Sequence, residues 1–312
     1  MKRYRMKIQM LSPVHIGSGE EIDPLEYIIK DDIFYRLDTT GFLKQMDESL
    51  KADFYEATNN PNPVSLRRFF AENLDPKKYY LYRLVAEPAL MRVYEQNLKD
   101  PKNQLRVNLM TRRAGDWRSY LPGSSIKGAI RTAVVSQYAN KNNVRPRDRR
   151  RFERQVLGYY DGKQDPFRCI KIPDALFPLD ATSIDAVQIV GREKDPANNP
   201  GGIQMFYERT FSFLEGEDIV AETMLAVDDK LPEYECFNKK AKRKVPAVSM
   251  QIDAGQIAGA CREFYQPKIQ ADHNKFYKPD RMRDKFNKPL LDVKFAENEF
   301  PIRLGRFSHI EC

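Results

Sequence analysis

Apolar and polar residues alternate along several short stretches of the chain, the pattern of strands that bury one face. The clearest stretch is residues 3–11, where Tyr4, Met6, Ile8 and Met10 fall on one face. Further strands are expected at residues 26–29, 33–37, 79–86, 104–110, 168–173, 186–190, 203–211, 218–227 and 300–307. The stretches at 26–29 and 33–37 predict a hairpin that turns at Asp31-Asp32.

Helical spacing of apolar residues predicts helices between these strands. We expect helices from Thr39 or Thr40 to Leu50, from Ser65 to Asn73, after residue 123, and from Val248 to Tyr265. Strands and helices interleave too irregularly for a doubly wound sheet, and no short repeat is evident. The sequence therefore predicts an α+β fold with two small sheets, each backed by helices.

The amino-acid composition indicates which partners and which cellular location to expect. The 312 residues include 52 Lys and Arg against 44 Asp and Glu, a net charge of +8, with 11% aromatic residues. Cations and aromatic rings together suit a polyanion such as RNA. The four cysteines form no C-x-x-C pair, so no zinc site is expected. No apolar stretch approaches the roughly 20 residues that span a bilayer, and we expect a cytoplasmic protein.

The most distinctive segment is residues 121–132, which predicts a strand end, a tight turn and a helix. Ser124 or Ser125 can cap this helix, whose free N–H groups attract anions. Lys127 and Arg131 lie near the same helix end and complete a possible phosphate clamp. A nucleotide P-loop has its lysine directly after the last glycine, whereas here Lys127 precedes Gly128, so the segment is not a P-loop. An ordinary amphipathic helix with solvated cations remains the alternative.

A second candidate site is the glycine-rich segment after the first strand. Its members are His15, Gly17, Ser18 and Gly19. Glycines let a ligand approach the backbone closely, and His15 can stack on a base, bond a phosphate or act as a general base. A turn with a hydrogen-bonded, partly buried histidine is the other interpretation.

Two carboxylates near this segment leave an enzymatic alternative open. Asp23 and Asp31 could hold Mg²⁺, and His15 could cleave RNA without a metal. Asp31 is better explained by the hairpin turn, and nothing in the sequence brings two of the three histidines together.

A third candidate combines cations with the only tryptophan. Arg112, Arg113 and Trp117 precede the distinctive segment and suit single-stranded nucleic acid, although Trp117 can instead anchor a core. Two basic runs, residues 145–154 and 239–244, are either solvated loops or arms that order on RNA or a partner.

These segments together resemble the repeat-associated mysterious protein (RAMP) superfamily of CRISPR systems. The resemblance rests on residues 15–19, 121–131, 172–175, 207–208 and 303–306, spread over nearly the whole chain. It is strongest to a subunit of the type III-A Csm effector complex. It implies two ferredoxin-like (RRM-like) modules with helical insertions, which we place at residues 1–165 and 166–312. The C-terminal module is expected to be shortened, because the chain reaches only Cys312 after the last motif.

The resemblance also implies a function. It indicates a non-catalytic subunit that binds crRNA, caps the filament of backbone subunits near the crRNA 3′ end and supports 3′-end maturation by recruiting host nucleases. Its partners would be crRNA and the backbone and small subunits of the Csm complex, with no cofactor, metal or membrane. The candidate RNA-binding residues are His15, Gly17, Ser18, Gly19, Arg112, Arg113, Trp117, Ser124, Ser125, Lys127, Arg131, Arg303 and Arg306. An endoribonuclease that acts through His15 or Asp23 and Asp31 is the alternative.

Overall fold

The chain folds into two compact units, each built from segments that are distant in the sequence. The computed structural model describes residues 1–145, 151–187, 205–238, 242–274 and 288–306. Unit 1 comprises residues 1–12, 120–177 and 212–312, and unit 2 comprises residues 13–119 and 178–211. The expected boundary at residue 165 does not coincide with these units. The reason is that the N-terminal strand β1 (Lys2–Gln9) pairs with β12 (Val220–Val227) over its whole length.

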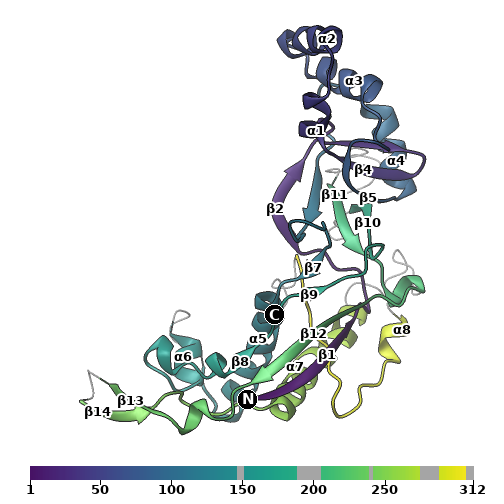
Figure 1. Cartoon of the computed structure of the whole chain (residues 1–312). Helices are drawn as coiled ribbons and strands as arrows, with labels where there is room; N and C mark the ends of the chain where they lie inside the picture. Colours follow the sequence, from purple (N-terminus) through teal and green to yellow (C-terminus); the bar gives the residue numbers. More distant parts are fainter. Residues whose placement is uncertain (146–150, 188–204, 239–241, 275–287, 307–312) are drawn as a thin grey trace. The chain divides into compact units, whose positions relative to one another are not determined.

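Unit 1 has a small sheet in the order β1-β12-β9-β7, with β8 also paired to β12 (Figure 1). Its other strands are β7 (Tyr120–Leu121), β8 (Ile170–Lys171) and β9 (Ala175–Leu176), with a separate hairpin of β13 (Glu235–Asn238) and β14 (Arg243–Pro246). Its helices are α5 (Gly123–Lys141), α6 (Phe152–Val156), α7 (Ala254–Asp272) and α8 (Lys288–Leu291), with 3₁₀ turns η1 (Gly162–Gln164), η2 (Pro166–Cys169), η3 (Phe213–Glu215) and η4 (Leu231–Glu233).

Helices α5 and α7 pack against each other because each has an apolar face. In α5 the predicted face is buried, including Ile126, Ile130 and Val134. The Tyr265 hydroxyl of α7 donates to the Ala129 carbonyl oxygen of α5 at 2.9 Å. Burying these apolar faces supplies most of the stability that a helix of this length has in water.

Unit 2 has a seven-stranded sheet in the order β2-β6-β11-β10-β5-β4-β3. Its strands are β2 (Gly17–Ile22), β3 (Tyr27–Lys30), β4 (Ile33–Leu37), β5 (Tyr80–Ala86), β6 (Val107–Met110), β10 (Thr182–Val187) and β11 (Met205–Thr210). Its helices are α1 (Thr39–Lys44), α2 (Glu48–Asn59), α3 (Pro63–Asn73) and α4 (Pro88–Asn97). Aromatic side chains fill its two cores, with Tyr27 and Phe34 stacked at 4.8 Å in one and Phe42 in the other.

The α+β class with ferredoxin-like modules is confirmed, and most predicted elements exist with shifted ends. The hairpin turns at Asp31 and Asp32, whose φ angles of 53° and 61° suit a tight turn. The expected helix after Thr39 is in fact two, α1 and α2, capped by Asp38 and Asp47. The predicted helix at 248–265 begins only at Ala254, where a capping box fixes its start.

The sequence analysis missed helix α4, although its first-turn Pro88 is a common helix start. It also predicted a strand that is absent. Residues 300–306 form no strand. Instead, Arg262 of α7 donates to the carbonyl oxygens of Ala296 and Glu299, and Pro301 has no N–H for a ladder. Within the described residues, no helix has both the length and the apolar character that crossing a membrane would require.

Two glycines of the same helix should respond oppositely to alanine. A Cβ at Gly123 would lie 1.9 Å from the Ile172 carbonyl oxygen, whereas a Cβ at Gly128 would meet no atom within 4 Å. We expect Gly123→Ala to lower the free energy of unfolding by about 2 kcal/mol or more through overpacking. Gly128→Ala should raise it by up to about 1 kcal/mol through helix propensity. Urea denaturation of both variants measures this, and equal stabilities would contradict the close contact at Gly123.

Candidate nucleic-acid interface

The start of helix α5 is held by the segment that follows β8. The Gly123 N–H donates to the Asp174 carboxylate at 2.8 Å, and the N-cap residue itself, Pro122, makes no side-chain cap. The expected cap by Ser124 or Ser125 is therefore wrong, since both lie inside the first turn. Asp174 does this work from outside the helix. The close approach at Gly123 explains why the motifs at 121–131 and 172–175 occur together.

One face of α5 is bare at this end. Ser124, Gly128 and Thr132 are exposed and lie one helical turn apart. A glycine inside a helix costs roughly 1 kcal/mol relative to alanine, and no neighbouring residue explains Gly128 by packing. Its absent side chain leaves room for another molecule to approach the helix backbone.

Lys127 is the cation best placed to serve this bare face. Its Nζ donates to the Ile170 carbonyl oxygen at 2.8 Å, and burial lowers the pKa of the amine, an effect that Asp165 partly offsets. An ammonium group has three N–H donors, and a carbonyl oxygen carries no countercharge. The Lys127 amine can therefore bind an anion without giving up its contact with β8.

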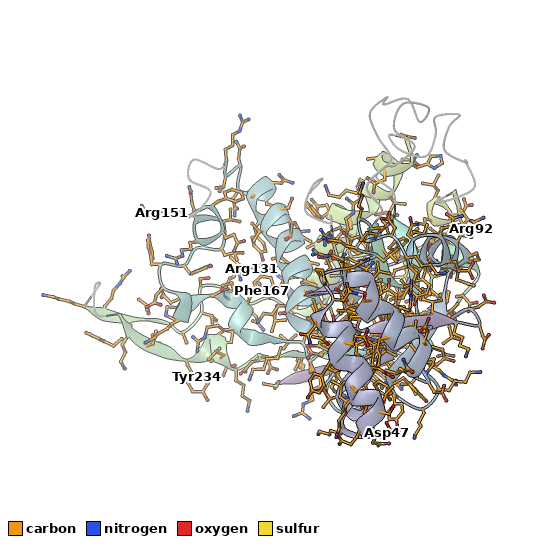
Figure 2. All side chains as sticks on the ribbon, turned by 90° about the horizontal axis from the view of Figure 1, so that it is seen from above. Asp47, Arg92, Arg131, Arg151, Phe167 and Tyr234 are labelled. Carbon is orange, nitrogen blue, oxygen red and sulfur yellow. The ribbon has the colours of Figure 1, made fainter. Side chains whose placement is uncertain are left out.

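Arg131 differs, because its charge is neutralised inside unit 1. Its guanidinium contacts Glu153 at 2.7 Å and Asp165 at 2.9 Å, and it also donates to the Tyr159 hydroxyl at 2.8 Å. The guanidinium carbon lies 4.9 Å from the centre of the Phe167 ring (Figure 2). These contacts anchor the 153–167 segment to α5. The two cations that the sequence analysis grouped into one clamp therefore have different partners: a carbonyl oxygen for Lys127 and two carboxylates for Arg131.

The glycine-rich segment forms an edge strand rather than the expected turn. Gly17, Ser18 and Gly19 are exposed at the start of β2, which lies at one end of the seven-stranded order. His15 precedes them, and its Nδ1 lies 2.6 Å from the Glu208 carbonyl oxygen. A Cβ at Gly17 would lie 2.9 Å from the His15 Nε2, so the ring position requires a glycine there.

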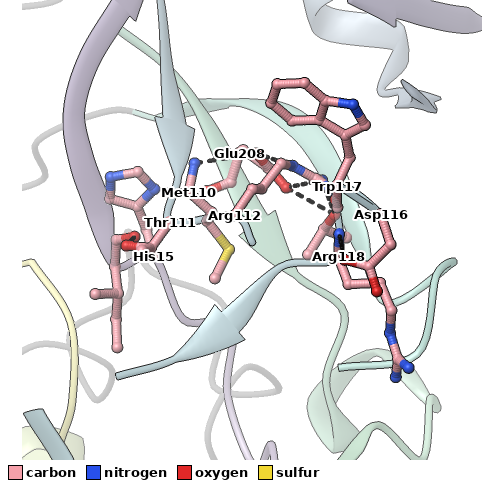
Figure 3. A network of polar contacts seen from close by, with 10 residues as sticks. His15, Met110, Thr111, Arg112, Asp116, Trp117, Arg118 and Glu208 are labelled. Carbon is pink, nitrogen blue, oxygen red and sulfur yellow. Dashed lines mark hydrogen bonds and ion pairs between the residues drawn. The ribbon is translucent and has the colours of Figure 1, made fainter. Parts of the chain in front are cut away.

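Arg112 lies inside unit 2, in a network with Glu208 of β11 (Figure 3). Glu208 is fully buried and Arg112 is 8% exposed. The carboxylate also accepts from the Met110 N–H at 3.0 Å and the Thr182 hydroxyl at 2.9 Å. The Arg112 guanidinium stacks on the Tyr82 ring at 4.0 Å and donates to the Trp117 carbonyl oxygen. Its charge is used within the fold, so we leave Arg112 out of the proposed interface.

The loop after Arg112 is held in a tight conformation. Trp117 adopts a φ of 56°, and its indole packs against the core beside Tyr82, as the core interpretation of this residue expected. Arg113 is exposed and pairs with Asp116, and this hydrogen-bonded partner lowers the pKa of Asp116 to about 2. Only Arg113 among the three candidates of this segment presents its charge at the surface.

The remaining candidate residues also have partners within the protein. Arg303 pairs with Asp272 of α7, and Arg306 also has an interaction partner. Asp23 accepts from the Leu25 N–H at 2.8 Å, and Asp31 lies in the hairpin turn, 3.4 Å from Lys77. The described residues contain no group of three or more potential metal-ligating His, Cys, Asp or Glu side chains. Half of the two basic runs, residues 146–150 and 239–241, lies outside the described residues.

The partners of the buried cations were not recognised in the sequence. Glu208 stands on the buried face of β11 between Phe206 and Thr210, and a carboxylate at such a position signals a buried ion pair. Asp165 and Glu153 carried no comparable signal, because only the tertiary fold brings their common partner, Arg131, close to them.

The fold and these motifs define a class of protein. A sequence model of the RAMP superfamily matches residues 7–306, so the chain belongs to this superfamily. Within it, the chain is similar to proteins described as CRISPR system Cms protein Csm5. That of Streptococcus thermophilus is 30% identical over 202 residues, which cover 60% of this chain and 55% of that protein.

Two further relatives carry the same description. The protein of Methanocaldococcus jannaschii is 26% identical over 190 residues, 55% of this chain and 42% of its own length. That of Mycobacterium tuberculosis is 24% identical over 244 residues, 67% of this chain and 63% of its own length. The chain thus spans about half the length of the curated relatives it matches.

Solved structures support the fold. The crystal structure of T. onnurineus Csm5 matches with a TM-score of 0.62 and 18% identity, covering 96% of this chain and 89% of that one. A chain in the cryo-EM structure of a type III-A Csm–crRNA–target RNA ternary complex matches with a TM-score of 0.67 and 19% identity, covering 96% and 83%. The expected resemblance to this Csm subunit is thereby confirmed.

The network around Glu208 should be a stability element that couples two residues. Removing one partner of a buried ion pair costs about 3–5 kcal/mol, because the other charge stays buried and unpaired. We therefore expect Arg112→Met and Glu208→Gln each to lower the free energy of unfolding by about this amount. The double variant should lose less than the sum. Chemical denaturation of the full cycle measures the coupling.

Arg113→Met serves as the control, since Arg113 is exposed on the same loop. Its effect should stay within about 0.5 kcal/mol. Additive losses in the cycle would contradict a direct Arg112–Glu208 interaction.

Proposed function

We propose that this chain is a non-catalytic crRNA-binding and assembly subunit of a type III-A CRISPR Csm effector complex. The observation that carries the proposal is the bare face of α5, defined by Ser124, Gly128 and Thr132, beside the Lys127 ammonium. Exposed Ser124 and Thr132 hydroxyl groups on either side of a glycine, with a lysine one position before it, suit a phosphate of an RNA strand.

The proposed interface contacts the RNA backbone and does not read bases. Its members in unit 1 are Ser124, Ser125, Lys127 and Gly128, and those in unit 2 are His15, Gly17, Ser18, Gly19 and Arg113. Hydroxyl groups, backbone N–H groups and cations bind phosphates of any sequence. Arg131 and Arg303 act indirectly, through the ion pairs that hold their segments in place.

The relatives support the proposed place in the assembly. Several are described as Csm5, and one structural neighbour belongs to a complex of Csm with crRNA and target RNA. By this analogy the chain caps the backbone filament near the crRNA 3′ end, contacts backbone and small subunits, and supports 3′-end maturation with host nucleases. The whole complex would serve antiviral defence in the cytoplasm.

Three contacts support a non-catalytic role over the ribonuclease alternative. The His15 Nδ1 is engaged by the Glu208 carbonyl oxygen, and Asp31 lies in a hairpin turn beside Lys77. Asp23 is used by its own turn at the Leu25 N–H. These contacts give each residue a local structural task, and none directs two catalytic groups at one point.

Binding of single-stranded RNA should depend on salt, and Lys127 should account for part of that dependence. If about four to six phosphates are neutralised, log affinity falls against log salt with a slope of about −3 to −4. We expect Lys127→Ala to flatten this slope by about 0.7. Fluorescence anisotropy with a labelled crRNA over a salt series measures the slope. Lys51→Ala, which removes a cation paired to Glu48 on α2, should leave it unchanged. An equal change in both variants would contradict a phosphate contact at Lys127.

A bulky neutral side chain at Gly128 should block the RNA without harming the fold. We expect Gly128→Gln to lower the crRNA recovered with tagged, co-expressed Csm subunits at least tenfold. Gly259→Gln is the matched control, because Gly259 also lies within a helix and its Cβ would meet no atom within 4 Å. Equal recovery of crRNA with both variants would contradict the interface, and failure of the wild-type chain to co-purify would contradict the proposed assembly.

A further inference from the structure

Strand β8 connects the start of α5 with the exposed face of the unit 1 sheet (Figure 1). The Ile170 carbonyl oxygen of β8 accepts from the Lys127 Nζ at 2.8 Å. Successive side chains of a strand point to opposite faces, and here Ile170 is fully buried whereas Lys171 is exposed. Lys171 therefore stands on the exposed face, one residue after the carbonyl group that holds Lys127.

Lys171 and Arg3 flank one small residue of β12. Ala226 pairs with Lys171 of β8 on one side and with Arg3 of β1 on the other, so the three side chains project from the same face. Neighbouring strands lie about 4.8 Å apart, which puts the backbones of the two outer residues roughly 10 Å from each other. Between the two long cationic side chains there is only the methyl group of Ala226. We call Arg3, Ala226 and Lys171 the cationic row.

The cationic row keeps its positive charge, unlike its neighbourhood. The Glu222 carboxylate contacts Arg5 at 2.6 Å. Asp228 accepts from two N–H groups of the turn that follows it, both at 3.1 Å, and Asp229 contacts the amino group of residue 1 at 2.9 Å. Within the described part of the chain, neither cation of the row has an ion pair of its own.

The charges of Lys127 and Lys171 act on each other. Burial is the main reason why the pKa of Lys127 is lowered, and the positive charges of Arg131 and Lys171 lower it further. Arg131 is neutralised by its two carboxylates, which leaves Lys171 as the uncompensated like charge. An anion that contacts both ammonium groups would relieve this repulsion.

We infer that an RNA strand bound at Lys127 continues across the cationic row, with its phosphates on Lys171 and Arg3 and its backbone over Ala226. This inference rests on the proposed RNA contact at Lys127 and names the residues that come next along the strand. Contacts with phosphates suit RNA of any sequence. The row itself offers a protein partner only one methyl group to bury, whereas its continuity with Lys127 through β8 favours RNA.

Each cation of the row should contribute to the salt dependence of RNA binding. We expect Lys171→Ala and Arg3→Ala each to flatten the slope of log affinity against log salt by about 0.7. Adding Lys127→Ala to both changes should flatten it by about 2. Lys141→Ala is the matched control, because Lys141 is exposed on α5 about 21 Å further along the helix axis, and it should leave the slope unchanged. Fluorescence anisotropy with a labelled crRNA over a salt series measures all variants.

Filling the space between the two cations tests the same path without removing a charge. We expect Ala226→Gln to lower the affinity for crRNA about fivefold or more, because the longer side chain displaces phosphates from both cations. Ala52→Gln, at an exposed position of α2, should change the affinity less than about twofold. Urea denaturation shows whether each variant keeps the stability of the wild-type chain.

Two results would overturn the inference and leave the proposed function standing. The first is a flattened slope for Lys127→Ala together with unchanged slopes for Lys171→Ala and Arg3→Ala. The second is an unchanged slope for the row variants with loss of co-expressed Csm subunits, which would assign the row to a protein partner. Binding of crRNA to the wild-type chain without any salt dependence would overturn both proposals.

Discussion

The antiparallel pairing of β1 with β12 is the constraint on which the rest of the structure depends. It joins residues such as Arg5 and Glu222, which are 217 positions apart, into one continuous ladder. Closing so long a loop costs more entropy than closing a local hairpin, although the cost grows only slowly with length. Because the ladder brings residues 2–9 next to residues 220–227, residues 13–119 and 178–211 form a unit of their own.

Several of the cations that the sequence analysis assigned to RNA binding work inside the protein. Arg112 neutralises the buried Glu208, and Arg131 ties two carboxylates to α5. Such buried pairs roughly break even in free energy against apolar substitutes, but they are costly to break once formed. Their effect is to fix segments that would otherwise have few contacts. Of the two candidate cations on α5, Lys127 contacts a carbonyl oxygen instead of a carboxylate, and it is the one that we propose for binding.

The sequence predicted those features that depend on local pattern. Alternation located β1, the 27–37 hairpin and β12, and helical spacing located α3, α5 and α7 within a few residues. It failed where a distant residue decides the outcome. Asp174 holds the start of α5 in place of a serine cap, and Glu208 draws Arg112 away from the surface. Two modules were expected, but the interleaved bounds of the two units were not, since no local signal in residues 3–11 identifies β12 as their partner.

The two glycines of α5 show how one motif can serve both the fold and a binding face. Gly123 is needed because the 172–174 segment crosses the helix start with no space for a side chain. Gly128 has ample space and still lacks a side chain, which costs helix stability without any packing gain. The fold therefore explains Gly123 by packing, and it leaves Gly128, five positions further along the helix, as the position that the proposed RNA contact would use.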